Sequence, residues 1–149
     1  MRLNPHLFPV RATVKNLLTK LGKVIVQGES PRGFTLRLTG QVRGGKNAMG
    51  ITRTGRHYAR TPFKIWRDAA VSGIQRQLPT GWIPIAGPVS VRLDYVAGDQ
   101  RRRDMPAILD AIWHVLEKAG VVTDDTLLWV TQSARSHDPK NAGATITFL

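Results

Sequence analysis

The sequence predicts an α/β (α+β) fold, with a single mixed β-sheet of about four strands, two main helices packed on it and a basic N-terminal helical extension. Apolar and polar residues alternate over 34–39 and 88–96, as in strands that bury one face. Apolar residues recur at helical spacing over 61–74 and 105–119. A chain of 149 residues, of which 42% are hydrophobic, is long and apolar enough to bury the core of one domain.

Residues 1–33 are expected to form a basic extension in front of the domain, which would comprise residues 34–149. Apolar residues at helical spacing between 11 and 22 predict a short amphipathic helix that ends at Gly22. The segment 28–33, which contains glycine and proline, then separates this extension from the first strand.

Residues 40–61 are rich in Gly, Arg and Lys and show no apolar period, so we expect a long surface loop. A loop of this length in a compact domain is more often functional than merely connecting. His57 is interpreted as polar surface, with a phosphate contact or a proton donor as the alternatives. The loop and the segment after it carry cations that we expect to contact phosphate: Arg43, Lys46, Arg53, Arg56, Arg60, Lys64 and Arg67.

The helix over 61–74 is expected to begin with Thr61 as its N-cap and Pro62 in its first turn. Asp104 is the natural N-cap of the second helix, about residues 105–119. Both helices have one apolar side, which predicts that they pack on the sheet.

The strand over 88–96 lies between the two helices, and two more strands are predicted at 126–131 and 144–149. We expect the residues between these last strands, 132–143, to form a polar loop. The order of elements predicts one mixed sheet with helices on it.

Charge is distributed unevenly along the chain. The net charge of +12 predicts a polyanionic partner, most simply nucleic acid, bound in a salt-sensitive way. Residues 1–70 carry 14 Lys and Arg but only two acids, whereas 99–125 hold six of the ten acids. A basic frame around an acidic patch is typical of a nuclease, because phosphates need cations and divalent metals need carboxylates. A solvated acidic surface explains the composition equally well.

Several classes of protein are excluded by composition. The sequence has no cysteine, so disulfides, thiolate metal sites and thiol catalysis are ruled out. It has no apolar run of the roughly 20 residues that cross a bilayer, and its first residues lack a signal-peptide apolar segment. We therefore expect a soluble cytoplasmic protein that does not associate with membranes.

Residues 101–104 are three arginines and an aspartate at a helix start, and residues 118–125 read Lys-Ala-Gly-Val-Val-Thr-Asp-Asp after that helix. Together they resemble the signature of the RusA-like Holliday junction resolvases, in which an arginine-rich segment leads to such an aspartate and a Lys-Ala-Gly-like turn precedes paired aspartates. The spacing fits without a gap. Residues 44–50 and 58–67 look like the basic loop and the following helix of the same family. The resemblance covers about residues 34–149.

The resemblance implies a homodimer that resolves four-way DNA junctions in recombination and repair by metal-dependent hydrolysis of phosphodiester bonds. The implied metal is Mg²⁺, with Mn²⁺ as an alternative, and hard cations of this kind prefer oxygen ligands. No small-molecule cofactor is implied. The expected metal ligands are Asp104, Asp124 and Asp125, and Asp110 is expected to complete the catalytic set. The expected DNA-binding residues are Arg101, Arg102, Arg103, Lys46, Arg53, Arg56, Arg60 and Lys118.

This sequence departs from the family pattern at the helix start. Many members have a second aspartate, then asparagine, where Pro106 and Ala107 stand here. Asp110 stands where the better-known members have lysine, and it points about 120° away from Asp104 around the helix. The loss of the second acid favours an alternative function, a catalytically inactive relative that only binds branched DNA. A basic RNA-binding module is a third possibility.

Each expected ligand also has a purely structural interpretation. Asp104 could be only an N-cap, and Asp124 with Asp125 could form a turn with a capping role. Asp110 and His114 could belong to a solvated polar stripe on the helix rather than to a metal site. For Asp104, Asp124 and Asp125, the joint spacing behind the three arginines favours the metal site. For Asp110 and His114 as a metal-binding pair, the solvated stripe is the favoured interpretation.

Overall fold

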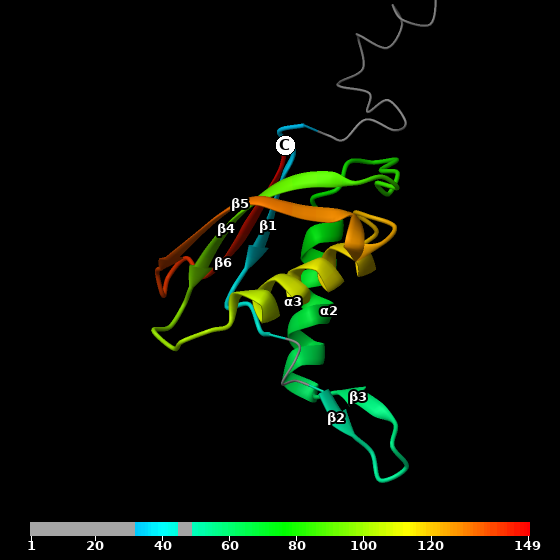
Figure 1. Ribbon diagram of the computed structural model, residues 1–149, viewed down its shortest axis with the longest axis vertical. Helices are drawn as coiled ribbons and strands as arrows, with labels where there is room; N and C mark the ends of the chain where they lie inside the picture. The colour runs from blue at the N-terminus through cyan, green and yellow to red at the C-terminus, as the bar shows by residue number, and fades with distance from the viewer. Residues whose placement is uncertain (1–31, 45–48) are drawn as a thin grey trace, which may run out of the picture.

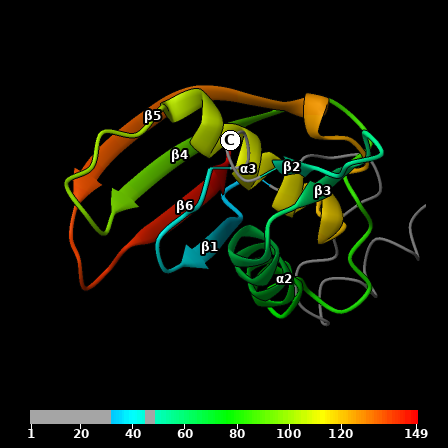
Figure 2. The same cartoon turned by 90° about the horizontal axis from the view of Figure 1, so that it is seen from below.

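The computed structural model describes residues 32–44 and 49–149. Its centre is a four-stranded mixed sheet in the spatial order β1-β6-β4-β5, which is clearest in Figure 2. β6 pairs antiparallel with both β1 and β4, and β4 pairs parallel with β5. The strands are β1 (Thr35–Thr39), β4 (Val89–Ala97), β5 (Leu128–His137) and β6 (Gly143–Phe148).

Two helices pack on one face of this sheet, α2 (Thr61–Gln75) and α3 (Met105–Lys118) (Figure 1). α3 connects β4 to the parallel strand β5, so it is the crossover that parallel pairing requires. The predicted mixed sheet and its two helices are therefore confirmed. The prediction of Thr61 as the N-cap of α2 was wrong by one residue. Arg60 occupies the N-cap position, and Thr61 is the first residue of the helix.

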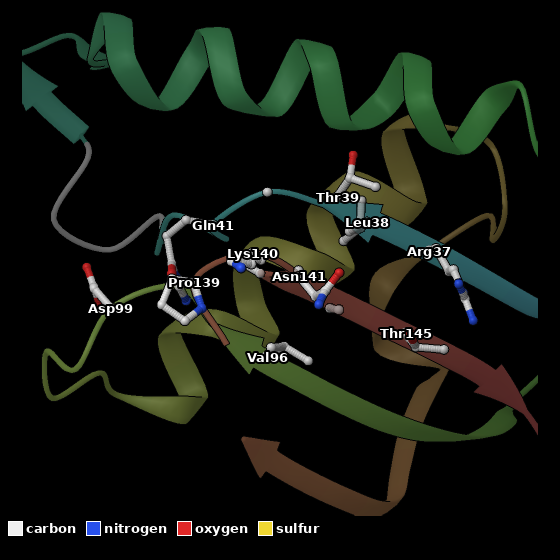
Figure 3. A pocket seen from close by; sticks show the side chains of 15 residues that line it. Arg37, Leu38, Thr39, Gln41, Val96, Asp99, Pro139, Lys140, Asn141 and Thr145 are labelled. Carbon is white, nitrogen blue, oxygen red and sulfur yellow. The ribbon is translucent and has the colours of Figure 1, made fainter. Parts of the chain in front are cut away.

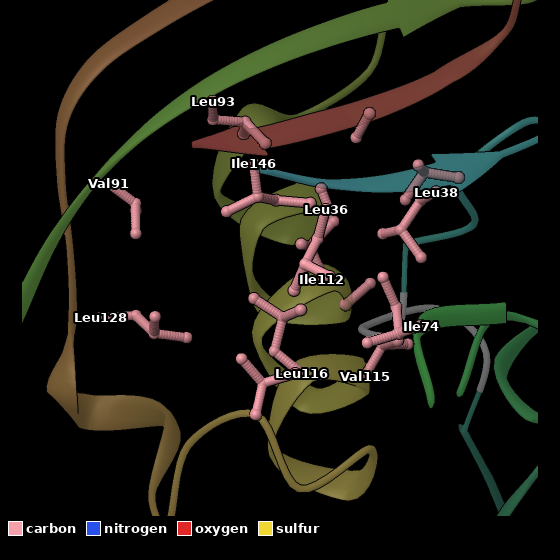
Figure 4. Close-up of a cluster of buried hydrophobic side chains, with 14 of the residues drawn as sticks. Leu36, Leu38, Ile74, Val91, Leu93, Ile112, Val115, Leu116, Leu128 and Ile146 are labelled. Carbon is pink, nitrogen blue, oxygen red and sulfur yellow. The ribbon is translucent and has the colours of Figure 1, made fainter. Parts of the chain in front are cut away.

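The core lies between the helices and the sheet, where side chains of α3 meet alternate residues of the strands (Figure 4). In β4, every second residue from Val89 to Ala97 is buried and the residues between them are not. This is the two-residue period of a strand with one covered face. Ile112 and Leu116 of α3 are fully buried at 0% exposure, as is Leu93 opposite them.

A short hairpin occupies part of the segment that was expected to be an irregular loop. β2 (Met49–Ile51) pairs antiparallel with β3 (His57–Ala59), and Figure 1 shows this ribbon extending away from the main sheet near the start of α2. The prediction of a long surface loop over 40–61 was therefore wrong for the residues of β2 and β3. The hairpin was missed because strands of three residues are too short to leave an apolar period in the sequence.

The prediction of a polar loop over 132–143 was also wrong in its first half, because β5 continues to His137. Its residues beyond Val130 are exposed, so nothing in their hydrophobicity marks them as a strand. Backbone pairing with β4 holds them, up to the pair of Ala97 with His137. The segment before β5 forms a short 3-10 helix, η2 (Asp125–Leu127).

The expected helix over 11–22 and the expected phosphate contact Lys46 lie outside the described residues. The boundary between the extension and the domain stays a prediction for the same reason. Among residues 32–44 and 49–149, no helix has both the length and the apolar character needed to cross a membrane.

Candidate functional site

Asp104 stands at the N-terminal end of α3 with a free carboxylate. It occupies the N-cap position, yet its side chain accepts no capping hydrogen bond from the helix, and it is exposed. A residue whose only role was to cap the helix would use its carboxylate to bind the first N–H groups. The geometry therefore leaves this carboxylate available to a cation.

The basic segment that precedes β2 begins beside this helix end. A Cβ atom on Gly44 would lie 3.5 Å from Cβ of Ala107, in the first turn of α3. Gly44 follows Arg43 and comes two residues before Lys46. Contact at Gly44 brings the start of this basic segment close to Asp104.

Asp124 lies beyond the other end of α3 and does serve as a cap. Its Oδ1 accepts hydrogen bonds from the backbone N–H of Thr126 at 2.8 Å and from Thr126 Oγ1 at 2.6 Å. Both bonds lower the pKa of Asp124 below its usual value, and the bond from the Thr126 hydroxyl has the larger effect. Asp125 follows as the first residue of η2 and is half-buried. The structural interpretation of the turn thus holds for Asp124.

Within one chain, the expected ligands stand before and after α3. Asp104 precedes α3 and Asp124 and Asp125 follow it, and a helix of 14 residues is about 20 Å long. Asp110 and Lys118 are exposed on α3 between them. In the part of the chain that the structure describes, no three His, Asp or Glu side chains gather into a group that could hold a metal ion.

The three arginines before Asp104 have different environments. Arg103 is mostly buried, with 21% of its side chain exposed, and its Nη2 donates to Oδ2 of Asp99 at 2.6 Å. Arg101 is 85% exposed, and Arg102 is also exposed. Arg103 is held by Asp99. Arg101, whose Nε lies 4.0 Å from Oδ2 of Asp99, and Arg102 are exposed enough to meet a phosphate.

Two residues near this site were not predicted from the sequence. Asp99 organises the loop, because its carboxylate also accepts a hydrogen bond from the backbone N–H of Arg101 at 3.3 Å. Arg135 of β5 donates from Nη2 to the carbonyl oxygen of Arg101 at 3.4 Å, which adds a cation beside the arginine run. The sequence carries no signal for Arg135, since only the pairing of β5 with β4 brings it here.

A hollow of about 710 Å³ opens next to the same loop, between the ends of β1, β4 and β6 (Figure 3). Gln41, which lines the hollow, connects two neighbouring segments by hydrogen bonds. Its Nε2 donates to the Tyr95 hydroxyl at 2.7 Å, and its Oε1 accepts from the Gly98 N–H at 2.5 Å. Lys140 and Asp99 contribute opposite charges to the lining. This mixed lining favours no single class of charged ligand.

The hairpin of β2 and β3 carries the other expected DNA contacts. Arg53 lies in its turn, Arg56 just before β3 and Arg60 just after it, and all three are exposed. Their exposure is consistent with the predicted phosphate contacts.

No family model matches the chain. A segment of 58 residues, 39% of the chain, is 29% identical to the crossover junction endodeoxyribonuclease RusA of Aquifex aeolicus (strain VF5). The match covers 46% of that protein, so the chain spans less than half the length of this relative. The chain thus has a partial similarity to a crossover junction endodeoxyribonuclease.

Proposed function

We propose that this protein is a RusA-like endodeoxyribonuclease that resolves four-way DNA junctions by hydrolysing phosphodiester bonds with Mg²⁺ or Mn²⁺. The observation that carries the proposal is the exposed carboxylate of Asp104, which makes no capping hydrogen bond and belongs to the same short segment as the exposed Arg101 and Arg102. An acid beside exposed guanidinium groups can hold a cation and a phosphate next to each other. The similarity to a crossover junction endodeoxyribonuclease supports the same reading.

The donor chemistry of the proposed site fits a hard divalent cation, because Asp104, Asp110, Asp124 and Asp125 all offer carboxylate oxygens. A bound ion would polarise the phosphate and make water a better nucleophile. Arg101 and Arg102 would bind and orient the phosphate beside it. Asp104 stands before α3 and Asp125 after it, and the 14 residues of this helix extend over about 20 Å, so in this proposal an ion bound by both takes its ligands from two copies of the chain.

A homodimer is therefore part of the proposal, and β5 is the surface that we favour for it. β5 is a ten-residue edge strand, and Trp129 on it is 64% exposed. β5 starts directly after η2, whose first residue is Asp125, and its far part reaches Arg101 through Arg135. Antiparallel pairing of two β5 edges about a twofold axis would bring Asp125 of one copy towards Asp104 of the other.

The activity is tested with a synthetic four-way junction and Mg²⁺. We expect the wild type to nick the junction, Asp104→Asn to abolish nicking and Glu117→Gln, on an exposed part of α3, to leave it unchanged. No nicking by the wild type, or full nicking by Asp104→Asn, would refute the catalytic assignment.

The shared site is tested by mixing two inactive variants, Asp104→Asn and Asp125→Asn. If the ligands come from two copies, a mixed dimer has one intact site, and about a quarter of the wild-type activity returns after subunit exchange. If the mixture stays inactive although both variants dimerise, the ligands do not combine across copies.

One observation favours a second function, a protein that binds branched DNA without cutting it. Pro106 replaces the second acid of the family pattern, and no three acidic or histidine side chains converge within residues 32–44 and 49–149. This alternative predicts salt-sensitive junction binding and no product at any concentration of Mg²⁺ or Mn²⁺.

A further inference from the structure

The hairpin of β2 and β3 has a well-defined tip. Thr52 donates its N–H to the carbonyl of Arg56 at 2.8 Å, and the Gly55 N–H donates to the carbonyl of Thr52 at 2.9 Å. Gly55 has φ +80°, a left-handed conformation that suits glycine at this point of a three-residue hairpin loop. These bonds order the tip, so side chains on the ribbon have defined directions.

Tyr58 lies flat across the ribbon on one of its two faces. It stands opposite Gly50 in the β2–β3 register. A Cβ atom on Gly50 would overlap the Tyr58 ring, with Cε1 and Oη both 2.7 Å away. One side of the ring therefore rests on the Gly50 backbone, and Tyr58 as a whole residue is still 50% exposed. A tyrosine held in this way presents a fixed, open aromatic surface.

Two arginines share this face of the hairpin with Tyr58. Alternate residues of an extended strand point to the same side, which places Arg56 and Arg60 with Tyr58. Arg60 is still extended, with φ −63° and ψ 146°, although it precedes α2. Both arginines are exposed. We call Arg56, Tyr58 and Arg60 the hairpin strip.

We propose that the hairpin strip binds unpaired nucleotides, with a base stacked on the Tyr58 ring and the neighbouring phosphates held by Arg56 and Arg60. An unpaired base offers its flat face to an aromatic ring, whereas a base inside a duplex is already stacked on its neighbours. The inference deepens the proposed function, because a branched substrate can expose unpaired nucleotides at its branch point. Binding by the strip requires no metal and no cleavage, so it can be tested separately.

The experiment measures binding of the full chain to a fluorescent single-stranded oligonucleotide, and to the matching duplex, by anisotropy in EDTA at fixed salt. We expect Tyr58→Ala to weaken single-strand binding about five- to hundredfold and duplex binding less than about twofold. Tyr58→Phe keeps the ring and should bind like the wild type. Ile51→Ala removes an exposed side chain from the opposite face and should also bind like the wild type.

The cationic part of the strip is tested by salt dependence. Replacing both Arg56 and Arg60 by Gln should reduce the slope of log affinity against log salt for the single strand by about 1.4. An unchanged slope would remove the two arginines from the proposal.

Three results would overturn the role of Tyr58. The first is wild-type affinity of Tyr58→Ala for the single strand. The second is an equal loss in Tyr58→Ala and Ile51→Ala, which would indicate a disturbed hairpin. The third is an equal loss for single strand and duplex. If the wild type does not nick the junction but Tyr58→Ala loses affinity for the single strand, the nuclease proposal is refuted and the proposed role of the hairpin strip is supported. If nicking succeeds while Tyr58→Ala binds normally, only the strip is refuted.

Discussion

Arg103 donates from Nη2 to Oδ2 of Asp99 across 2.6 Å, and this pair divides the three arginines before α3 by role. Arg103 turns inward and holds the loop, whereas Arg101 remains 85% exposed beside Asp104. The hydrogen bond from Arg103 is the main reason why the pKa of Asp99 lies below its usual value of 3.8.

The Asp99–Arg103 pair predicts a pH-dependent contribution to stability. Because the pKa of Asp99 is lowered by folding, the pair stabilises the folded state above pH 3.8 and loses this effect as pH falls through the lower folded value. Asp99→Asn should therefore lower the Tm at neutral pH, and its Tm should approach that of the wild type in acid. Thermal unfolding followed by circular dichroism across this range checks it. A constant Tm difference at every pH would contradict the assignment.

The same division predicts different effects of two arginine substitutions. Arg101→Gln should weaken junction binding and lower the slope of log affinity against log salt by about 0.9, with an unchanged Tm. Arg103→Gln should lower the Tm because it leaves Asp99 without its partner. Binding titrations at several salt concentrations, together with thermal unfolding, separate the two. If both variants lost stability equally, Arg101 would also be structural.

The two ends of α3 predict a contrast between Asp104 and Asp124. Asp124→Ala should destabilise the protein, because Thr126 loses the acceptor of two hydrogen bonds. Asp104→Ala should change the free energy of unfolding by less than about 1 kcal/mol, since it makes no capping hydrogen bond. Urea unfolding measures both values. A larger loss in Asp104→Ala than in Asp124→Ala would show that Asp104 is needed for folding.

Gln77 is predicted to protect the free edge of β1. Its Oε1 accepts the Arg37 N–H and its Nε2 donates to the Arg37 carbonyl, each at 2.8 Å, as a neighbouring strand would. Gln77→Ala should cost about 1 kcal/mol of stability and speed hydrogen exchange at the Arg37 amide. Gln75→Ala, at an exposed position of α2, is the matched control. Equal exchange rates in the two variants would argue against this role.

Gly143 is predicted to be irreplaceable for steric reasons. A Cβ atom there would overlap the carbonyl oxygen of Leu38 and lie 3.2 Å from its carbonyl carbon, where β6 meets β1. Gly143→Ala should therefore destabilise the fold by about 2 kcal/mol or more. Gly87→Ala is the control, because no atom lies within 4 Å of its added Cβ. Chemical denaturation of both variants tests it, and similar stabilities would rule the contact out.

Local periodicity was enough to predict most of the regular elements. The apolar spacing of α2 and α3 and the alternation of β1 and β4 reflect one covered face, which each segment records in its own residues. Short strands and exposed strands carry no such apolar pattern in their residues. The hairpin around Gly55 could have been suspected from Thr-Arg-Thr-Gly between two short segments, since glycine suits the left-handed position of such a loop.

The sequence alone determined that the chain is basic, that its acids gather around α3 and that Asp104 starts this helix. Tertiary structure decided which of these groups meet. Pairing of β5 with β4 brings Arg135 to Arg101, and Asp99 rather than a phosphate holds Arg103. α3 keeps Asp104 apart from Asp125 because a straight helix carries its ends away from each other, however well their spacing matches a motif. Proximity between distant residues depends on strand order and helix length, which no local pattern of side chains records.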